Sequence, residues 1–325
     1  MLPRVRYLLG RLLQVAPVAF LIILANFFLL RLAPGDLADV MAGEAGAATP
    51  EFMAALRQQF GADQPVLVQL VNYYQRILSF DLGYSFRNGA DVTSLIVARL
   101  PATALLVGVS LFLAVVLGVA LGWLAAVTPR RWISGLVSLV TSIGFATPLF
   151  WIGLMLIVLF SIELRWLPTG GFYDRDAGYE GWDLVVDVAR HMIMPVASLA
   201  IFYVTIYARL TTTAILEVQK MDYVRTAQAK GLGPRYISIV HVLRNALLPI
   251  VTVSGMQIGA LISGSVVIET VFAWPGMGRL AFDAVMQRDL NLLLGILFCT
   301  SLLVIAANLV TDLVYALLDP RIELQ

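Results

Sequence analysis

Residues 221–249 form a polar, basic stretch between two long apolar runs. Both lysines of the sequence, Lys220 and Lys230, lie in or beside this stretch, as do Arg225 and Arg235. Cations interleaved with small residues suit charge contacts with another protein, whereas bond-making chemistry needs positioned acids, bases or nucleophiles. The stretch therefore indicates a docking element.

A short helix is expected at the start of this stretch. Asp222 is of the type that caps a helix N-terminus, and Gly231 is of the type that follows a helix C-terminus. Between them the sequence predicts a helix of about two turns over 223–230, kept slim by Ala227 and Ala229. A slim helix in a polar loop suits insertion into a groove on a partner.

A second helix is expected to begin at Pro234. Its apolar residues recur at helical spacing and would line one face: Tyr236, Ile239, Val240, Leu243 and Leu247. This pattern predicts an amphipathic helix lying along a membrane surface. An ordinary basic loop followed by a surface helix, with no docking role, would give the same composition.

The residue types needed for catalysis or metal binding are too few. A phosphate-binding loop needs Gly followed by Lys, but Lys220 and Lys230 follow Gln and Ala. The two histidines, His191 and His241, are too far apart for a zinc motif on one helix, and the single cysteine, Cys299, sits in an apolar run. We therefore expect no catalytic residue, metal or cofactor in this chain.

The composition indicates an integral membrane protein. Of 325 residues, 60% are hydrophobic and 13% charged, and the mean hydropathy is +0.86, whereas soluble domains carry about 25% charged residues. The net charge of +1 argues against a nucleic-acid partner. Apolar runs long enough to cross a bilayer predict an all-α protein with six spans: 12–30, 101–127, 132–162, 192–216, 250–272 and 292–318.

Prolines mark the predicted spans. Pro101 and Pro195 are expected in the first turn of their helices, where proline is tolerated, and Pro148 is expected to kink the third span. Ionisable residues are scarce in the spans and lie within a few turns of span ends: Arg209, Glu269 and Asp312. This scarcity argues against a stand-alone carrier driven by protons or sodium, which usually needs buried carboxylates on its ion path.

The loops divide the chain. Residues 1–30 form an N-terminal tail and first span, 31–100 a polar segment, and 101–320 a five-helix core containing the loop 217–248. Within the polar segment, short helices are predicted after Thr49, over 67–78 and after Asp91. Basic residues are densest in the loops 128–131 and 217–248, so the positive-inside rule places these loops and both termini in the cytoplasm.

Glycines four residues apart indicate close helix packing. Gly118 and Gly122 lie in the second predicted span, and Gly255 and Gly259 in the fifth. Small residues at this spacing let helix backbones approach. The packing could be internal, or the Gly255 face could meet a partner or a pore.

The basic stretch resembles the cytoplasmic-loop signature of inner-membrane permeases from binding-protein-dependent ABC importers. That signature has the form Glu-Ala-Ala, three residues, then Gly; here the seven positions are Arg-Thr-Ala-Gln-Ala-Lys-Gly at 225–231. The first two positions depart from the general form and resemble the dipeptide/oligopeptide/nickel branch, with YVRTAQAKGL at 223–232 and HVLRNALLP at 241–249. The branch usually has Arg where this chain has Gln228.

Further matches to that branch extend along nearly the whole chain. They are LAPGD at 32–36, DLGYS at 81–85, LPAT at 100–103, LPTGG at 167–171, GSVVIE at 264–269, FAWPGMG at 272–278 and RD at 288–289. The large polar segment after the first span resembles the B-type subunit of the permease pair.

The resemblance implies a type I importer permease fold and a pore subunit that is not itself an enzyme. Its partners would be a second homologous permease, two cytoplasmic subunits that bind ATP and Mg²⁺, a periplasmic or lipid-anchored substrate-binding protein, and membrane lipids. ATP binding would drive alternating access. The residues implied in coupling to the ATPase are Asp222, Tyr223, Arg225, Thr226, Ala227, Lys230 and Gly231.

The resemblance also implies an outer loop near the binding protein, formed by Glu269, Trp274, Pro275, Gly276 and Gly278. We expect Ala227 and Gly231 to provide the close fit to the ATPase, and Arg225 and Lys230 its charge contacts. A di- or oligopeptide is the expected substrate. Nickel or another small solute of the same branch is the alternative, as is a stand-alone secondary carrier.

Overall fold

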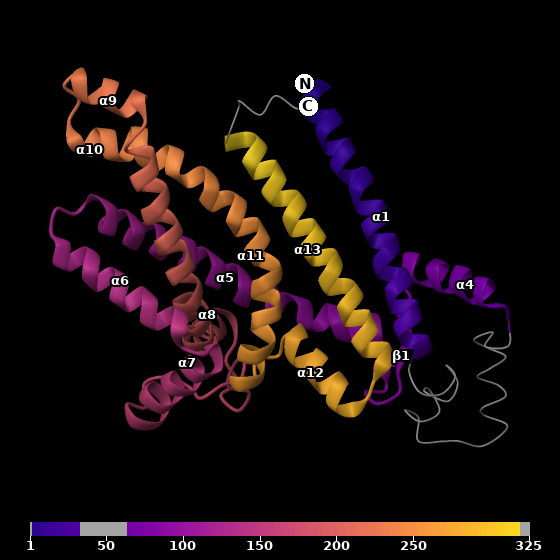
Figure 1. Ribbon diagram of the computed structural model, residues 1–325. Coiled ribbons are helices and arrows are strands. Elements are labelled where there is room, and N and C mark those ends of the chain that lie inside the picture. The colour runs from indigo at the N-terminus through magenta and orange to yellow at the C-terminus, as the bar shows by residue number, and fades with distance from the viewer. Residues whose placement is uncertain (1, 33–63, 319–325) are drawn as a thin grey trace. The chain divides into compact units, whose positions relative to one another are not determined.

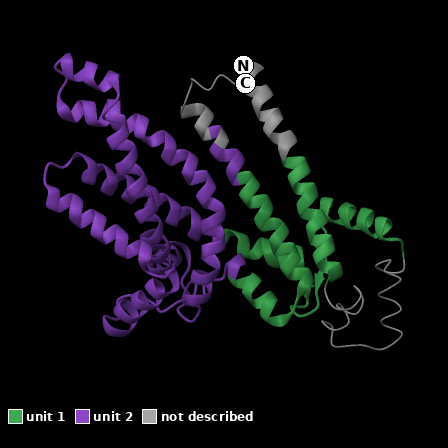
Figure 2. Cartoon of the chain, viewed as in Figure 1, with its two compact units in different colours: residues 1–101, 279–306, 324–325 green, residues 102–278, 307–323 purple. Residues whose placement is uncertain are grey.

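The described part of the chain folds into helices (Figure 1), with one small two-stranded hairpin. The computed structural model describes residues 2–32 and 64–318, with the side chains of 15–32, 64–311 and 313. It divides into two compact units: residues 1–101 with 279–306, and residues 102–278 with 307–323 (Figure 2). The helix predicted after Thr49, most of the LAPGD turn and the Asp312 side chain lie outside the described residues.

The first unit contains α1 (Leu2–Leu32), α4 (Val66–Leu78), the strands β1 (Tyr84–Ser85) and β2 (Ala90–Asp91), and parts of α5 (Val92–Val127), α12 (Met277–Gln287) and α13 (Leu290–Leu318). The strands pair antiparallel. The Phe20 ring stacks on that of Tyr74, with centroids 4.9 Å apart, so α4 lies against α1. The helices predicted over 67–78 and after Asp91 are confirmed.

The second unit holds most of the remaining helices: α6 (Arg131–Ala146), α7 (Leu149–Leu156), the π-helical η1 (Ile157–Glu163), α8 (Gly181–Val218), α9 (Asp222–Ala229), α10 (Pro234–Tyr236), the π-helical η2 (Ile237–Leu243) and α11 (Arg244–Val271). Its core packs α8 against α5 and α11 around Leu106, Leu199, Tyr207, Ile268 and Trp274. The side chains on the facing surfaces of these helices are therefore largely apolar.

Glycines allow the close approach of these helices. A Cβ on Gly122 of α5 would lie 2.6 Å from the Thr211 Cβ of α8, and one on Gly255 of α11 would overlap the Thr311 side chain of α13. Both contacts are internal to this chain. The internal-packing interpretation of the Gly118/Gly122 and Gly255 motifs is therefore confirmed at Gly122 and Gly255.

Among the residues that the structure describes, five helical segments are long and apolar enough to cross a membrane: Val15–Leu32, Val92–Val127, Gly181–Val218, Pro234–Val271 and Leu290–Thr311. A sixth crossing would be the pair Arg131–Ala146 and Leu149–Glu163, which is bent by 102°. The predicted kink at Pro148 was wrong in degree, because the helix breaks there. Proline lacks an N–H and holds the residue before it extended, and Thr147 has φ −84° and ψ 128°.

Two other boundaries differ from the prediction. Pro101 and Pro195 were expected in the first turns of their helices, but α5 begins at Val92 and α8 at Gly181, so both prolines lie inside long helices. The separate surface helix predicted from Pro234 is also wrong. α10, η2 and α11 follow one another without an intervening coil residue and form one helical run to Val271.

Candidate functional site

The short helix of the basic stretch is present as α9, which follows the end of α8 (Figure 1). The prediction that Asp222 caps it was wrong. Met221 holds the N-cap position with φ −70° and ψ 146°, and no side chain caps the helix. Asp222 is instead the first helical residue, where a carboxylate still favours the positive end of the helix dipole. Its carboxylate lies 3.6 Å from the Arg225 guanidinium, and both side chains are largely exposed.

The predicted end of α9 at Gly231 is confirmed. Gly231 has φ +72°, in the left-handed region that glycine adopts without a Cβ penalty. Its N–H donates to the Gln228 carbonyl at 2.9 Å, and the Leu232 N–H donates to the Ala227 carbonyl at 3.3 Å. These two bonds form a Schellman motif, which turns the chain sharply toward α10.

One face of α9 packs against its own chain. Val224 is 1% and Ala227 5% exposed, and both join a cluster with Ile215 of α8 and Ile237 and Val242 of η2. Ala227, expected to fit closely against a partner, is therefore directed into this internal cluster. Its small side chain lets α9 approach η2.

The opposite face of α9 is exposed. It carries six of the seven residues predicted to couple to a partner: Asp222, Tyr223, Arg225, Thr226, Lys230 and Gly231. The Tyr223 hydroxyl also donates to the His241 carbonyl at 3.4 Å, which links this face to η2. The structure thus presents a polar, cationic surface on a helix that its own chain supports from behind.

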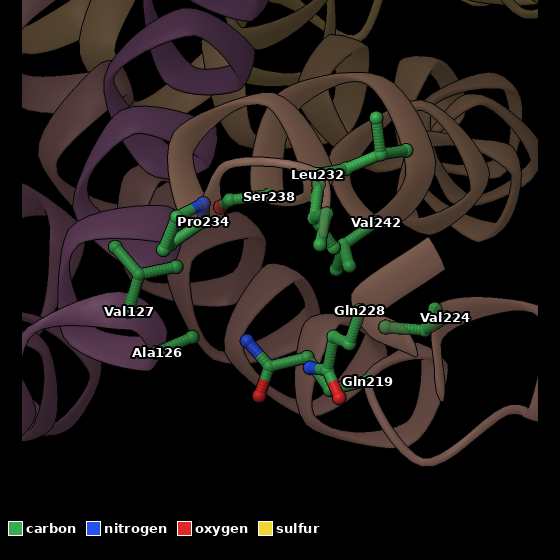
Figure 3. A pocket seen from close by; sticks show the side chains of 10 residues that line it. Ala126, Val127, Gln219, Val224, Gln228, Leu232, Pro234, Ser238 and Val242 are labelled. Atoms are coloured by element: carbon green, nitrogen blue, oxygen red, sulfur yellow. The ribbon is translucent and has the colours of Figure 1, made fainter. Parts of the chain in front are cut away.

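A cavity of about 540 Å³ lies beside α9 (Figure 3). Its walls come from the ends of α5 and α8, from α9, and from the segment 232–242: Ala126, Val127, Gln219, Val224, Gln228, Leu232, Pro234, Ile237, Ser238 and Val242. None of these lining residues is ionisable, so the cavity suits insertion of a side chain better than acid–base catalysis. Gln219 and Ser238 carry no periodic signal in the sequence that would mark them as cavity-lining residues.

A second arrangement of interest joins Ala102 and Thr103 of α5 to the end of α11 and the loop after it. Glu269 is fully buried, and its Oε1 accepts a hydrogen bond of 2.7 Å from the Thr103 hydroxyl. The same hydroxyl oxygen accepts the Met277 N–H at 2.7 Å. The Trp274 indole, also fully buried, donates to the Ala102 carbonyl at 2.9 Å. We call Thr103, Glu269 and residues 272–278 the loop anchor.

Glycines make room for this buried carboxyl group. A Cβ on Gly276 would overlap the Glu269 carboxyl group, and one on Gly278 would lie 2.6 Å from the Val266 Cα. Of the five residues predicted near a binding protein, only Pro275 is partly exposed; Glu269, Trp274, Gly276 and Gly278 are buried. These four residues support the loop from inside, and its contact with a binding protein remains a prediction.

In the ranges that the structure describes, the remaining polar groups form no catalytic constellation. His191 lies inside α8 and is 7% exposed, and its Nδ1 lies 2.9 Å from the Asp187 carbonyl oxygen one turn earlier. Among the residues that the structure describes, no group of three or more His, Cys, Asp or Glu side chains could hold a metal ion.

The structure combines long apolar helices and a bent helix pair with a short exposed helix that packs on its own chain. This combination is that of a multi-pass membrane transport component. The chain belongs to the family of binding-protein-dependent transport system inner membrane components, whose model matches residues 118–324. The model of that family's N-terminal region matches residues 4–107. The chain is thus a permease subunit of an ABC importer and lies in the inner membrane.

Curated relatives match over nearly their whole length. The oligopeptide transport system permease protein AppB of Bacillus subtilis is 37% identical over 322 residues, covering 98% of this chain and 99% of that protein. The di/tripeptide transport system permease protein DppB of Pseudomonas aeruginosa is 36% identical over 333 residues, with the same coverage.

Solved structures share the fold. An inward-facing structure of the MetNI methionine ABC transporter matches with a TM-score of 0.55 at 18% identity, covering 69% of this chain and 96% of that one. An amino acid ABC transporter matches with a TM-score of 0.51 at 16% identity, covering 71% of this chain and 95% of that one. The predicted importer permease fold is confirmed.

Proposed function

We propose that this chain moves di- or oligopeptides across the cytoplasmic membrane by alternating access, as one of two homologous permease subunits. AppB and DppB, which match it end to end, are named for oligopeptide and di/tripeptide transport. A periplasmic or lipid-anchored binding protein delivers the substrate. ATP and Mg²⁺ are bound by two separate cytoplasmic subunits.

The observation that carries the coupling role is the two-sided character of α9. Its inner face is buried against α8 and η2, so a push on α9 displaces these helices. Its outer face presents Tyr223, Arg225, Thr226 and Lys230 to a partner. Cationic side chains on a convex helix suit a groove lined by acidic groups, because electrostatic complementarity sets register and association rate. We assign this groove to the ATPase subunits.

Gly231 allows a test that separates docking from folding. A Cβ there would meet no atom within 4 Å, and a non-glycine residue at its φ of +72° costs about 1–2 kcal/mol. Gly231→Ala and Gly231→Arg share this backbone cost but differ in bulk, and Gly231→Asn carries less of it because Asn tolerates the left-handed region.

The assay measures peptide uptake and ATP hydrolysis of the complete importer with its binding protein in proteoliposomes. We expect Gly231→Asn and Gly231→Ala to retain most uptake. Gly231→Arg should remain assembled in the membrane while ATP hydrolysis becomes uncoupled from uptake. Normal uptake by Gly231→Arg would refute docking at this surface. Uptake driven by an ion gradient with no ATPase present would instead support a stand-alone carrier.

A further inference from the structure

A second cavity in the same unit, of about 220 Å³, lies between α5, α6 and α8. Its walls are rich in hydroxyl groups: Ala125, Ser134, Val137, Ser138, Thr141, Ala208, Arg209, Thr212 and Thr213. No residue lines both this cavity and the one beside α9. We call it the Arg209 cavity.

The Arg209 cavity carries one ionisable group, the Arg209 guanidinium, which is exposed. No carboxylate in the described part of the chain lies within ion-pair distance of it. The hydroxyls of Ser134, Ser138 and Thr213 make no hydrogen bond to other described residues. A guanidinium with several free O–H donors is the donor set that an oxyanion requires.

Helix geometry places this donor set near one end of the bundle. Ser134, Ser138 and Thr141 recur at helical spacing along α6, which begins at Arg131. At 1.5 Å per residue they lie about 4–15 Å along the helix from its start. Arg209 lies nine residues before the end of α8 at Val218, or about 14 Å. Both helices thus bring the cavity to a similar depth from their cytoplasmic ends.

That depth suits the boundary between headgroups and acyl chains. Trp132 at the start of α6 is 64% exposed, and Trp and Arg are typical of this boundary. The aliphatic part of the Arg209 side chain lets its guanidinium extend toward the membrane surface and meet a phosphate there. Arg130 and Arg131 next to α6 are exposed and add attraction for anionic lipid.

The neighbouring surface of α6 suits an acyl chain. Leu136, Leu139, Val140 and Ile143 are each between 51% and 58% exposed, and they follow one another along the helix beside the cavity-lining residues. An exposed apolar surface of this kind on a helix of a membrane protein suits contact with an acyl chain. A free anion from the cytoplasm would gain nothing from it, so the surface favours a lipid over a soluble phosphate.

We propose that the Arg209 cavity binds the phosphate headgroup of an anionic phospholipid. Arg209 supplies the charge, the hydroxyls of Ser134, Ser138 and Thr213 supply neutral donors, and an acyl chain lies along the exposed apolar surface of α6. The site is distinct from the surface of α9 and does not depend on which solute is carried.

The test uses the full-length chain in its importer complex, purified in nanodiscs of phosphatidylcholine with or without phosphatidylglycerol. Native mass spectrometry measures phosphatidylglycerol retained per complex. Loss of one cation near the headgroups is expected to lower the retained phosphatidylglycerol about fivefold in Arg209→Gln. Arg209→Lys keeps the charge and should retain more phosphatidylglycerol than Arg209→Gln. The matched control is Lys220→Gln, just beyond the end of the same helix and outside the cavity; it removes the same charge, and it should lower retention less than Arg209→Gln does.

Two further variants test the hydroxyl groups of the cavity. Ser134→Val and Ser138→Val each remove a hydroxyl donor from the cavity wall and add a little bulk without removing charge, so retention should fall in both even if Arg209→Gln does not fold. Inorganic phosphate at millimolar concentration should not displace the lipid; displacement by inorganic phosphate alone would identify a free-anion site. Displacement by a dipeptide would identify a substrate path. Either displacement, or unchanged retention in a folded Arg209→Gln complex, would overturn the proposal.

Discussion

Thr103 offers a direct measure of how firmly the loop anchor holds residues 272–278. Its hydroxyl donates to Glu269 Oε1 and accepts the Met277 N–H, both at 2.7 Å. Thr103→Val keeps the shape and removes both bonds. The buried Met277 N–H then loses its partner, which costs about 1–3 kcal/mol, and the lost bond to Glu269 adds about 1 kcal/mol. We expect a decrease of about 2–4 kcal/mol in the free energy of unfolding.

The assay is reversible unfolding of the purified chain in mixed micelles, combined with amide hydrogen exchange of residues 272–278. Exchange in this loop should accelerate in Thr103→Val and stay near normal in Thr103→Ser, which keeps a hydroxyl. The matched control is Thr93→Val on the same helix. The Thr93 hydroxyl donates at 2.8 Å to the Phe80 carbonyl in an exposed setting, so its loss should cost at most about 1 kcal/mol. An equal cost for the two valine variants would refute the anchor.

Three further predictions concern stability. The hydrogen bond from Arg76 lowers the pKa of Asp81, so the pair stabilises the fold above the ordinary Asp pKa and loses this effect as pH falls through the lowered value. Asp81→Asn should therefore reduce the free energy of unfolding by less than about 1 kcal/mol at pH 7 and leave it unchanged in acid. Thermal unfolding at a series of pH values measures this difference. Asp289 caps α13, accepting the Leu292 N–H at 3.0 Å, so Asp289→Ala should cost about 1–3 kcal/mol in chemical unfolding, and no loss would exclude the cap. Gly255→Ala should lower the unfolding midpoint through its overlap, whereas Gly135→Ala, with open space around it, should not.

Features that depend on local sequence were predictable from it. Apolar runs identified the membrane-crossing helices, and the helical spacing of Leu67, Leu70 and Tyr74 identified α4. Gly231 marked the end of α9 because a left-handed residue is needed there. The exposed face of α9 followed from its charged residues, since charge seldom tolerates burial.

Features that depend on distant partners were not predictable. Ala227 is too small to reveal which way it faces, and its burial follows from the packing of η2 behind it. A carboxylate such as Glu269 is expected at the surface, but it is buried because it accepts a hydrogen bond from Thr103, which lies 166 positions earlier in the chain. Pro148 signals a disturbance, whereas the 102° bend depends on where α7 packs. Such outcomes are set by tertiary contacts rather than local propensity.

The unbroken helical run from Pro234 to Val271 has a mechanical consequence. Its 38 residues give a contour length of about 57 Å, nearly twice the hydrocarbon thickness of about 30 Å. The run is therefore longer than one crossing requires, and its first part contains η2, against which α9 packs. Under the docking proposed above, a force applied at α9 would act on a helical run in which no coil residue separates η2 from Glu269, near the end of α11.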